Sequence, residues 1–283
     1  MKYLITGRSG QLARSFIRTL EARSIDFNAP EESLLDITDI DIVTNAIDSY
    51  KPDVIINCAA YNFVDKAEQA RDAAFLVNAR GPQNLAMAAA RRKAMFVHFG
   101  SDYVFDGMKE HGLYIENDFV NPVNEYGKSK LAGEQHVIKE LDRHLIMRLS
   151  WVFGSGEQNF IHKLLQWSKS NEWLKIACDE FSVPTSTQTV VDVTLHALEK
   201  GVTGLYHLTN TGYCSRYEWA RFIFSTLGIK KFIRPVTMDT FNLPAQRPRF
   251  SAMSNERLSA LLNTRIPTWE GAVKDFLKDT EKL

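Results

Sequence analysis

Short apolar runs alternate with amphipathic segments of helical length through the first two-thirds of the chain. Each apolar run is continuous rather than alternating, which is typical of strands that helices cover on both faces. The predicted strands are Lys2–Thr6, Ser24–Asn28, Val54–Cys58, Ala94–Phe99 and His144–Leu149. The predicted helices are Gln11–Arg23, Ile40–Tyr50, Glu68–Phe75, continuing after a break as Asn78–Arg92, and Tyr126–Glu140. The pattern therefore predicts an α/β fold, a Rossmann-type doubly wound parallel sheet.

The pattern is looser beyond about Phe153. The elements predicted there are helices over Phe160–Lys169, Thr189–Lys200, Tyr217–Leu227 and Trp269–Leu277, strands over Leu174–Cys178 and Leu205–Leu208, and a proline-containing loop over Leu243–Arg249. Among them, Thr189–Lys200 and Leu205–Leu208 are regular enough to rejoin the main sheet. We therefore expect a nucleotide-binding domain over residues 1–153 plus about 187–210, and a smaller, interleaved C-terminal substrate domain over about 154–186 and 211–283.

The 283 residues, 45% hydrophobic and 24% charged, describe an ordinary globular protein. Lysine plus arginine and aspartate plus glutamate both total 34, so no net charge favours a nucleic acid or an anionic membrane as partner. Three scattered cysteines without zinc-binding spacing indicate free thiols in a reducing compartment. Because neither a signal peptide nor a long apolar run is found, we expect a cytoplasmic protein.

Two glycines stand directly after the first predicted strand, in Gly7-Arg8-Ser9-Gly10-Gln11-Leu12-Ala13. Gly7 permits a tight turn, Gly10 lets a pyrophosphate approach the backbone, and Ala13 lets the helix pack close to the strand. The N–H groups at the start of the helix then face the phosphates. Glycine turns between strand and helix are common, but this position within a βαβ unit favours dinucleotide binding.

Tyr126 and Lys130 are four residues apart at the start of a predicted helix, so their side chains share one face. A nearby ammonium stabilises a phenolate and lowers the pKa of the phenol, which makes Tyr126 a usable general acid for a carbonyl oxygen. Ser101 follows the fourth strand, at the edge where open α/β sheets bind ligands, and its hydroxyl can align the same oxygen. The alternative is a surface helix start with unrelated Tyr and Lys, but the three features together favour carbonyl reduction.

The coenzyme is only partly readable from the sequence. NAD-specific sites place an acid after the second strand, where this chain has Asp26 within the predicted strand. Arg8 lies in the glycine turn, where a guanidinium can meet a 2′-phosphate. We expect NADPH, with NADH tolerated; the alternative for Arg8 is a solvated turn residue.

The order of the glycine turn, Ser101 and Tyr126-x-x-x-Lys130 resembles the extended short-chain dehydrogenase/reductase superfamily, and within it the chain is similar to the dTDP-4-dehydrorhamnose reductases. The similarity runs through Val64–Glu68, Ser101–Gly107, Tyr126–Glu134, Arg148–Phe153, Asp179–Thr185, Gly204–Leu208 and Pro244–Pro248. The resemblance implies a catalytic triad of Ser101, Tyr126 and Lys130. It also implies reduction of the C4 ketone of a dTDP-linked 6-deoxy-4-ketohexose by a monomer or homodimer.

The resemblance also implies binding residues. Besides Gly7, Arg8, Tyr126 and Lys130, the implied cofactor contacts are Gly10, Gln11, Leu12, Asp36, Ile37, Ala60, Tyr61 and Asn62. Besides Ser101 and Tyr126, the implied substrate contacts are Val64, Asp102, Tyr103, Trp151 and Arg247. Asp36 and Ile37 suit an adenine, through the carboxylate and an apolar face, but the segment also reads as a helix N-cap. Trp151 is either a cover for the sugar or base, or a core tryptophan.

Departures from the family pattern affect two expectations. Gln246 before Arg247 interrupts what is often a paired arginine, which weakens one phosphate contact. Some relatives are described with a magnesium ion held partly by an acid of the first helix, whereas this helix begins Ala13-Arg14-Ser15-Phe16, so we predict no metal. Two other functions stay open: reduction of a different nucleotide 4-keto sugar, and a non-catalytic regulatory or binding subunit of the same fold. The intact triad favours an enzyme.

Overall fold

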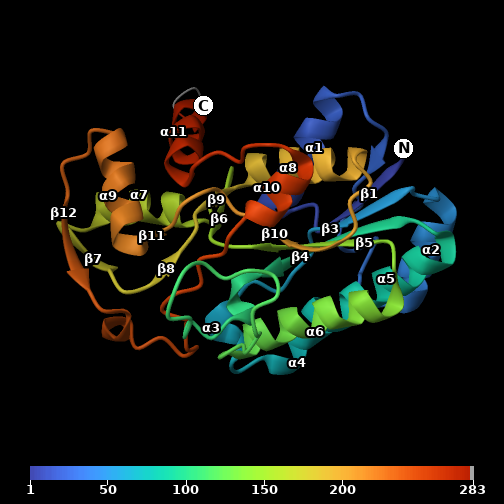
Figure 1. Cartoon of the computed structure of the whole chain (residues 1–283), viewed down its shortest axis with the longest axis horizontal. Coiled ribbons are helices and arrows are strands. Elements are labelled where there is room, and N and C mark those ends of the chain that lie inside the picture. Colours follow the sequence, from blue (N-terminus) through green and yellow to red (C-terminus); the bar gives the residue numbers. More distant parts are fainter. Residues whose placement is uncertain (281–283) are drawn as a thin grey trace.

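The computed structural model describes residues 1–280 (Figure 1). Its central sheet is six-stranded, in the order β10-β5-β4-β3-β1-β2, and every neighbouring pair is parallel. The strands are β1 (Tyr3–Thr6), β2 (Phe27–Asn28), β3 (Val54–Asn57), β4 (Met95–Ser101), β5 (His144–Leu149) and β10 (Gly204–His207). The predicted doubly wound sheet is confirmed, and β10 joins it as predicted.

Helices cover both faces of this sheet (Figure 1). They are α1 (Gln11–Ala22) and α8 (Thr187–Glu199) on one face, and α2 (Ile40–Tyr50), α5 (Gly81–Arg92) and α6 (Glu125–Glu140) on the other. The first face packs on a buried core that includes Phe16 and Val190, and the second on one that includes Ile47 and Leu85. Because side chains alternate across a strand, both faces need apolar residues, which explains the continuous apolar runs.

Two expectations for the first region were wrong in detail. The second strand is short because Ser24 adopts a left-handed φ of 53° and the amide of Ile25 bonds back to Leu20, so these residues end α1. The predicted break after Phe75 is a continuous helical path instead. There α4 (Arg71–Phe75) passes through a π-helical turn, η1 (Leu76–Arg80), into α5. Such turns insert one extra residue and often occur at functional sites.

The rest of the chain builds a smaller unit beside the carboxyl ends of the sheet strands (Figure 1). Two short helices belong to the first region: α3 (Val64–Ala67) and η2 (Asp102–Val104). The elements of the later region are β6 (Val152–Phe153), α7 (Phe160–Ser170), β7 (Trp173–Ala177), β8 (Phe181–Ser182), β9 (Thr185–Ser186), β11 (Cys214–Ser215), α9 (Arg216–Thr226), β12 (Phe232–Val236), η3 (Met238–Phe241), α10 (Glu256–Leu262) and α11 (Trp269–Thr280). A separate core containing Trp219 and Val273 holds this unit together. Leu258 and Leu262 of α10 pack instead with the sheet. Among the described residues, no helix has the length and apolar character needed to cross a membrane.

Candidate active site

The turn between β1 and α1 has the geometry of a phosphate-binding loop. Gly7 has a φ of +69°, and a Cβ there would lie 2.6 Å from the backbone nitrogen of Ala59, so only glycine fits. Gly10 is the N-cap of α1, and no side chain caps the helix there. The first amides of α1 are therefore available to an anion, which the positive end of the helix dipole also attracts.

A cavity of about 700 Å³ extends from this turn along the carboxyl ends of β3, β4 and β5. It brings together most of the predicted site residues: Gly10, Gln11, Leu12, Ala60, Asn62, Val64, Ser101, Asp102, Tyr103, Tyr126, Lys130 and Trp151. These residues come from five separate stretches of the chain. The carboxyl edge of a parallel sheet is where α/β folds bind ligands.

Ser101 ends β4, and Tyr126 lies in the first turn of α6. Ser101 accepts a hydrogen bond from the amide of Tyr103 at 3.2 Å and donates to Asp102 at 3.3 Å. Burial raises the pKa of Tyr126 to about 12; a hydrogen bond with Ser101 opposes that shift, and the charge of Asp102 adds to it. The phenol is therefore protonated near neutral pH and hydrogen-bonded to the serine.

Lys130 is only 4% exposed, and its ammonium donates to the carbonyl oxygen of Phe99 at 2.6 Å. Burial lowers the pKa of Lys130 to about 8, against the opposing charge of Glu134. The expected net lowering of the Tyr126 pKa is not found, because burial of the phenol dominates and the Lys130 ammonium contacts the carbonyl of Phe99. Burial thus moves the pKa values of the tyrosine and the lysine apart, and in each case it favours the neutral form.

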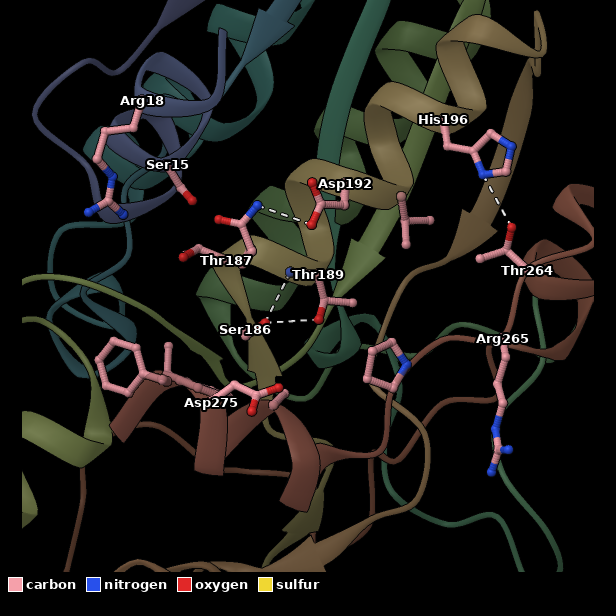
Figure 2. Close-up of a pocket in the computed structure, with 16 residues that line it drawn as sticks. Ser15, Arg18, Ser186, Thr187, Thr189, Asp192, His196, Thr264, Arg265 and Asp275 are labelled. Carbon is pink, nitrogen blue, oxygen red and sulfur yellow. Dashed lines mark hydrogen bonds between the residues drawn. The ribbon is translucent and has the colours of Figure 1, made fainter. Parts of the chain in front are cut away.

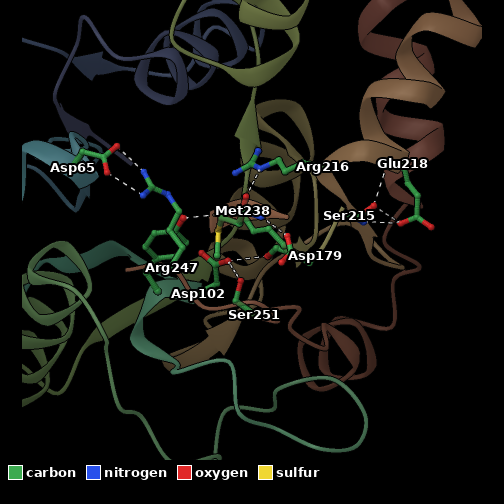
Figure 3. A network of polar contacts seen from close by, with 12 residues as sticks. Asp65, Asp102, Asp179, Ser215, Arg216, Glu218, Met238, Arg247 and Ser251 are labelled. Atoms are coloured by element: carbon green, nitrogen blue, oxygen red, sulfur yellow. Dashed lines mark hydrogen bonds and ion pairs between the residues drawn. The ribbon is translucent and has the colours of Figure 1, made fainter. Parts of the chain in front are cut away.

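Asp102 faces the smaller unit (Figure 3). The carboxylate of Asp102 accepts hydrogen bonds from Ser182 at 2.8 Å and from Ser251 at 2.6 Å. Burial raises its pKa to about 6, against these hydrogen bonds and the charge of Arg216. The hydroxyl of Tyr103 donates to Glu180. Both side chains predicted to bind substrate are thus engaged with protein groups.

Trp151 packs against two other side chains. The guanidinium of Arg216 is centred 3.5 Å from its ring centroid, and Trp219 stacks at 5.7 Å with an interplanar angle of 8°. Its φ of +40° is unusual for a residue with a side chain, and its indole nitrogen is buried with no hydrogen-bond partner among the described residues. In this structure Arg216 covers one face of the ring.

Sequence reasoning missed Arg216, which lines the same cavity. It is the first residue of α9, directly after a capping box in which Ser215 and Glu218 bond each other's backbone. The sequence Ser-x-x-Glu marks such a helix start, so a signal for the position of Arg216 was present. Nothing local indicated that this helix start would lie over Trp151.

Five predicted cofactor residues do not line the cavity: Gly7, Arg8, Asp36, Ile37 and Tyr61. Arg8 donates to the carbonyl of Ala29 at 3.1 Å, just past β2, and pairs with Glu31 at 3.3 Å. Asp36 accepts from the amide and hydroxyl of Thr38 at 2.8 and 2.7 Å. Ile37 is buried in the core. The alternative interpretation of this segment as a helix N-cap is correct, but the capping residue of α2 is Asp39 and not Asp36.

Two further predicted residues are held by polar partners. The backbone of Tyr61 bonds in both directions with Asn78 of the π turn, at 2.8 and 3.0 Å. The guanidinium of Arg247 forms a two-pronged ion pair with Asp65 of α3, at 2.9 and 2.7 Å (Figure 3). Arg247 lines a neighbouring cavity of about 920 Å³, which shares Trp151 and Arg216 with the first one.

A separate cavity of about 440 Å³ lies where α1 and α8 meet α11 (Figure 2). Its lining includes Ser15, Thr187, Asp192, His196 and Asp275. None of the predicted site residues lines it. Its position on the α1 side of the sheet separates it from the catalytic candidates.

The doubly wound sheet, the glycine turn after its first strand, and serine, tyrosine and lysine in one cavity at its carboxyl edge define the class of short-chain dehydrogenases/reductases. Residues 1–282 match the model of the RmlD substrate binding domain family, and the chain belongs to that family.

Individual relatives agree with this assignment. The dTDP-4-dehydrorhamnose reductase of Aggregatibacter actinomycetemcomitans is 35% identical, over 97% of this chain and 98% of the relative. The solved structure of a dTDP-4-dehydrorhamnose reductase from Clostridium acetobutylicum is 36% identical with a TM-score of 0.96, covering 99% of this chain and 100% of that one. A reductase of the same name from Bacillus anthracis, solved in complex with NADP, is 34% identical with a TM-score of 0.94, over 98% and 99% of the two chains. The resemblance seen in the sequence motifs is confirmed.

Proposed function

We propose that this protein uses NADPH to reduce the C4 ketone of dTDP-4-dehydrorhamnose, giving dTDP-L-rhamnose. The single observation that carries the proposal is the convergence of Ser101, Tyr126 and Lys130 in the cavity that begins at the glycine turn. Relatives that share the whole length of the chain bear the name of this activity, and one of them was solved with NADP.

Tyr126 acts as the proton donor. Bound NADPH supplies hydride to the ketone carbon, and the ketone oxygen gains negative charge as a result. With a pKa raised to about 12, the phenol is fully protonated and ready to donate in the direction of reduction. The hydroxyl of Ser101, which donates to Asp102 in this structure, turns to donate a hydrogen bond to the ketone oxygen and stabilises the charge as it develops. After transfer, the positive charge of Lys130 stabilises the phenolate.

The residues that would hold the cofactor come from the carboxyl edge of β1 and β3. The uncapped amides of Gln11 and Leu12 at the start of α1 would hold its pyrophosphate. Ala60 and Asn62 line the same cavity. The exposed guanidinium of Arg8, beside the end of β2, would meet the 2′-phosphate and favour NADPH over NADH.

The nucleotide of the substrate extends from the catalytic cavity into the neighbouring one of about 920 Å³. Lys163 and Arg216 line both cavities, so their positive charges stand where a diphosphate would cross between them. Val64 and Trp151 border the sugar, and Arg247 borders the nucleotide side. Arg216 must leave the face of Trp151 if the indole is to cover the sugar.

The test is to mix the purified protein with NADPH and dTDP-4-dehydrorhamnose and to follow the near-ultraviolet absorbance of the reduced nicotinamide. We expect the absorbance to fall only when both compounds are present, with dTDP-L-rhamnose as the product by chromatography against a standard. Unchanged absorbance with this sugar, but a fall with another nucleotide 4-keto sugar, would replace the substrate assignment. Unchanged absorbance with every such sugar would favour the non-catalytic alternative.

Other parts of the proposal have their own tests. We propose a two-domain monomer or homodimer that needs no metal and binds no nucleic acid, in line with its balanced charge. Full activity after exhaustive chelation supports the metal-free site, and activity restored only by added magnesium contradicts it. Light scattering measures the oligomeric state directly.

A further inference from the structure

The carboxylate of Asp102 lies at the seam between the sheet and the smaller unit. It is 3% exposed and follows Ser101 directly in the chain. One carboxylate oxygen accepts hydrogen bonds from Ser182 and Ser251, at 2.8 and 2.6 Å, and the other accepts from Ser101 at 3.3 Å. We call Asp102 with Ser182 and Ser251 the Asp102 clasp.

The two hydroxyls that hold the clasp come from segments fixed against each other. The amide of Phe181 donates to the carbonyl of Arg249 at 2.7 Å, and the amide of Ser251 donates to Phe181 at 2.9 Å. Ser182 is further held by pairing with Cys214 of β11. Because these segments form part of the smaller unit, both hydroxyls move with it.

On its other side, Asp102 is part of the turn that places the proposed catalytic serine. Asp102 begins η2, for which Ser101 is the N-cap, accepting from the amide of Tyr103. The carbonyl of Asp102 accepts from the amide of Phe105 and closes the turn. A shift of the Asp102 side chain therefore changes the acceptor that orients the Ser101 hydroxyl.

Asp102 is a carboxylate buried at this seam. A buried carboxylate is unfavourable unless hydrogen bonds and positive charge compensate, and burial raises the pKa of Asp102 to about 6 in spite of three serine hydroxyls and Arg216. The ionisable groups that sense its charge are Tyr103 and Tyr126, together with Arg216.

We propose that Asp102 is a positioning residue, which couples the seating of the smaller unit against the sheet to the orientation of the Ser101 hydroxyl. The inference rests on the proposed function and changes the role that the family resemblance implied for Asp102. The carboxylate of Asp102 binds the hydroxyls of Ser182 and Ser251. Substrate that draws the smaller unit into place therefore moves these hydroxyls, and through Asp102 it orients Ser101. The clasp thus links substrate seating to the group that aligns the ketone.

The test removes the two donors and leaves Asp102 and Ser101 untouched. In the double variant Ser182→Ala/Ser251→Ala we expect kcat to fall by about tenfold or more, while the Kd for NADPH stays within about twofold, since neither serine lines the cavity that begins at the glycine turn. The acid limb of the kcat profile should also move to higher pH, because losing the two hydroxyls raises the pKa of Asp102 further. Ser15→Ala is the matched control, a buried serine of α1 away from the site, with unchanged kcat expected.

A readout without turnover separates the clasp from the proposed function. Hydrogen exchange of the amides of Tyr103 and Phe105 should be faster in the double variant than in the native chain and the control. Native kcat and native exchange in the double variant would overturn the clasp. Equal losses of NADPH binding and kcat would also overturn it, because they indicate general misfolding. A native chain that reduces no nucleotide sugar would refute the proposed function, whereas faster exchange in the double variant would still support the coupling.

Discussion

The two cavities on either side of Trp151–Phe153 differ in how far the charged side chains that line them are exposed to solvent. Trp151 and Val152 line the catalytic cavity, whereas Phe153 lines the cavity between α1, α8 and α11 (Figure 2). In the first cavity Lys130 and Asp102 are 4% and 3% exposed. In the second, the side chains of Asp192 and Asp275 are 50% and 81% exposed and pair with Arg23 and Lys278.

The difference shows what distinguishes a reactive site from a hollow in the packing. Charges that face solvent cost little and need no precise partners, whereas buried charges shift their pKa values and depend on each neighbour. The serines show the same contrast. Ser101 bonds with Asp102 and Tyr103, but the buried hydroxyl of Ser15 has no partner among the described residues.

The sharpest way to break the comparison is to remove one polar atom from the catalytic cavity. Tyr126→Phe keeps the ring but removes the proton donor, so we expect kcat to fall by about 10²–10⁴-fold, as general acid catalysis implies. NADPH binding, measured by fluorescence titration, should be unchanged. Tyr206→Phe on β10 is the control and should keep native turnover. A Tyr126→Phe variant within tenfold of native kcat would refute the assigned proton donor.

A second test uses the buried charge of Lys130. Its pKa is lowered to about 8, so the fraction of charged lysine falls as the pH rises through about 8. If the charge is needed, kcat/KM should decrease by about tenfold per pH unit above that value. Lys130→Arg keeps its charge to much higher pH and should extend the plateau, even if its maximum rate is lower. An identical alkaline limb in both proteins would show that another group titrates.

Most of the sheet and part of the site could be predicted from the sequence because their signals are local. Each of these signals spans only a short stretch of sequence. They are the continuous apolar runs, the Gly7–Gly10 spacing and the four-residue spacing of Tyr126 and Lys130. The π turn escaped prediction because one extra residue leaves no clear mark on the apolar pattern, although it places Asn78 against Tyr61.

The rest of the site depends on contacts that no local pattern contains. Asp102 meets Ser182 and Ser251 across 80 and 149 positions, and Arg216 covers Trp151 from the start of α9. The pKa of Tyr126 was expected to fall beside Lys130 but is raised instead. The sequence spacing predicts that the two side chains share a helix face, but it does not predict their burial. Burial, which decides the direction of both pKa shifts, emerges only when the sheet, α6 and the smaller unit pack together.

A smaller effect tests the edge of the catalytic cavity, where charge is exposed again. Arg8→Ala removes the proposed partner of the 2′-phosphate, and one charge-assisted hydrogen bond corresponds to roughly tenfold in affinity. We expect the ratio of kcat/KM for NADPH over NADH to fall by about that factor, with NADH kinetics unchanged. Glu31→Gln, which frees Arg8 from its ion pair, should raise the ratio. If neither variant changes the ratio, Arg8 is a solvated turn residue.

The smallest effect belongs to the second cavity. Ser15→Ala removes a buried hydroxyl that has no hydrogen-bond partner among the described residues and places a better helix former within α1. We expect the free energy of unfolding to rise by about 1 kcal/mol, which moves Tm upwards by about 2 °C for a chain of this size. Calorimetry of the two proteins measures the shift. A lower Tm would mean that the Ser15 hydroxyl binds something in that cavity, and the contrast between the two cavities would then be one of occupancy rather than of chemistry.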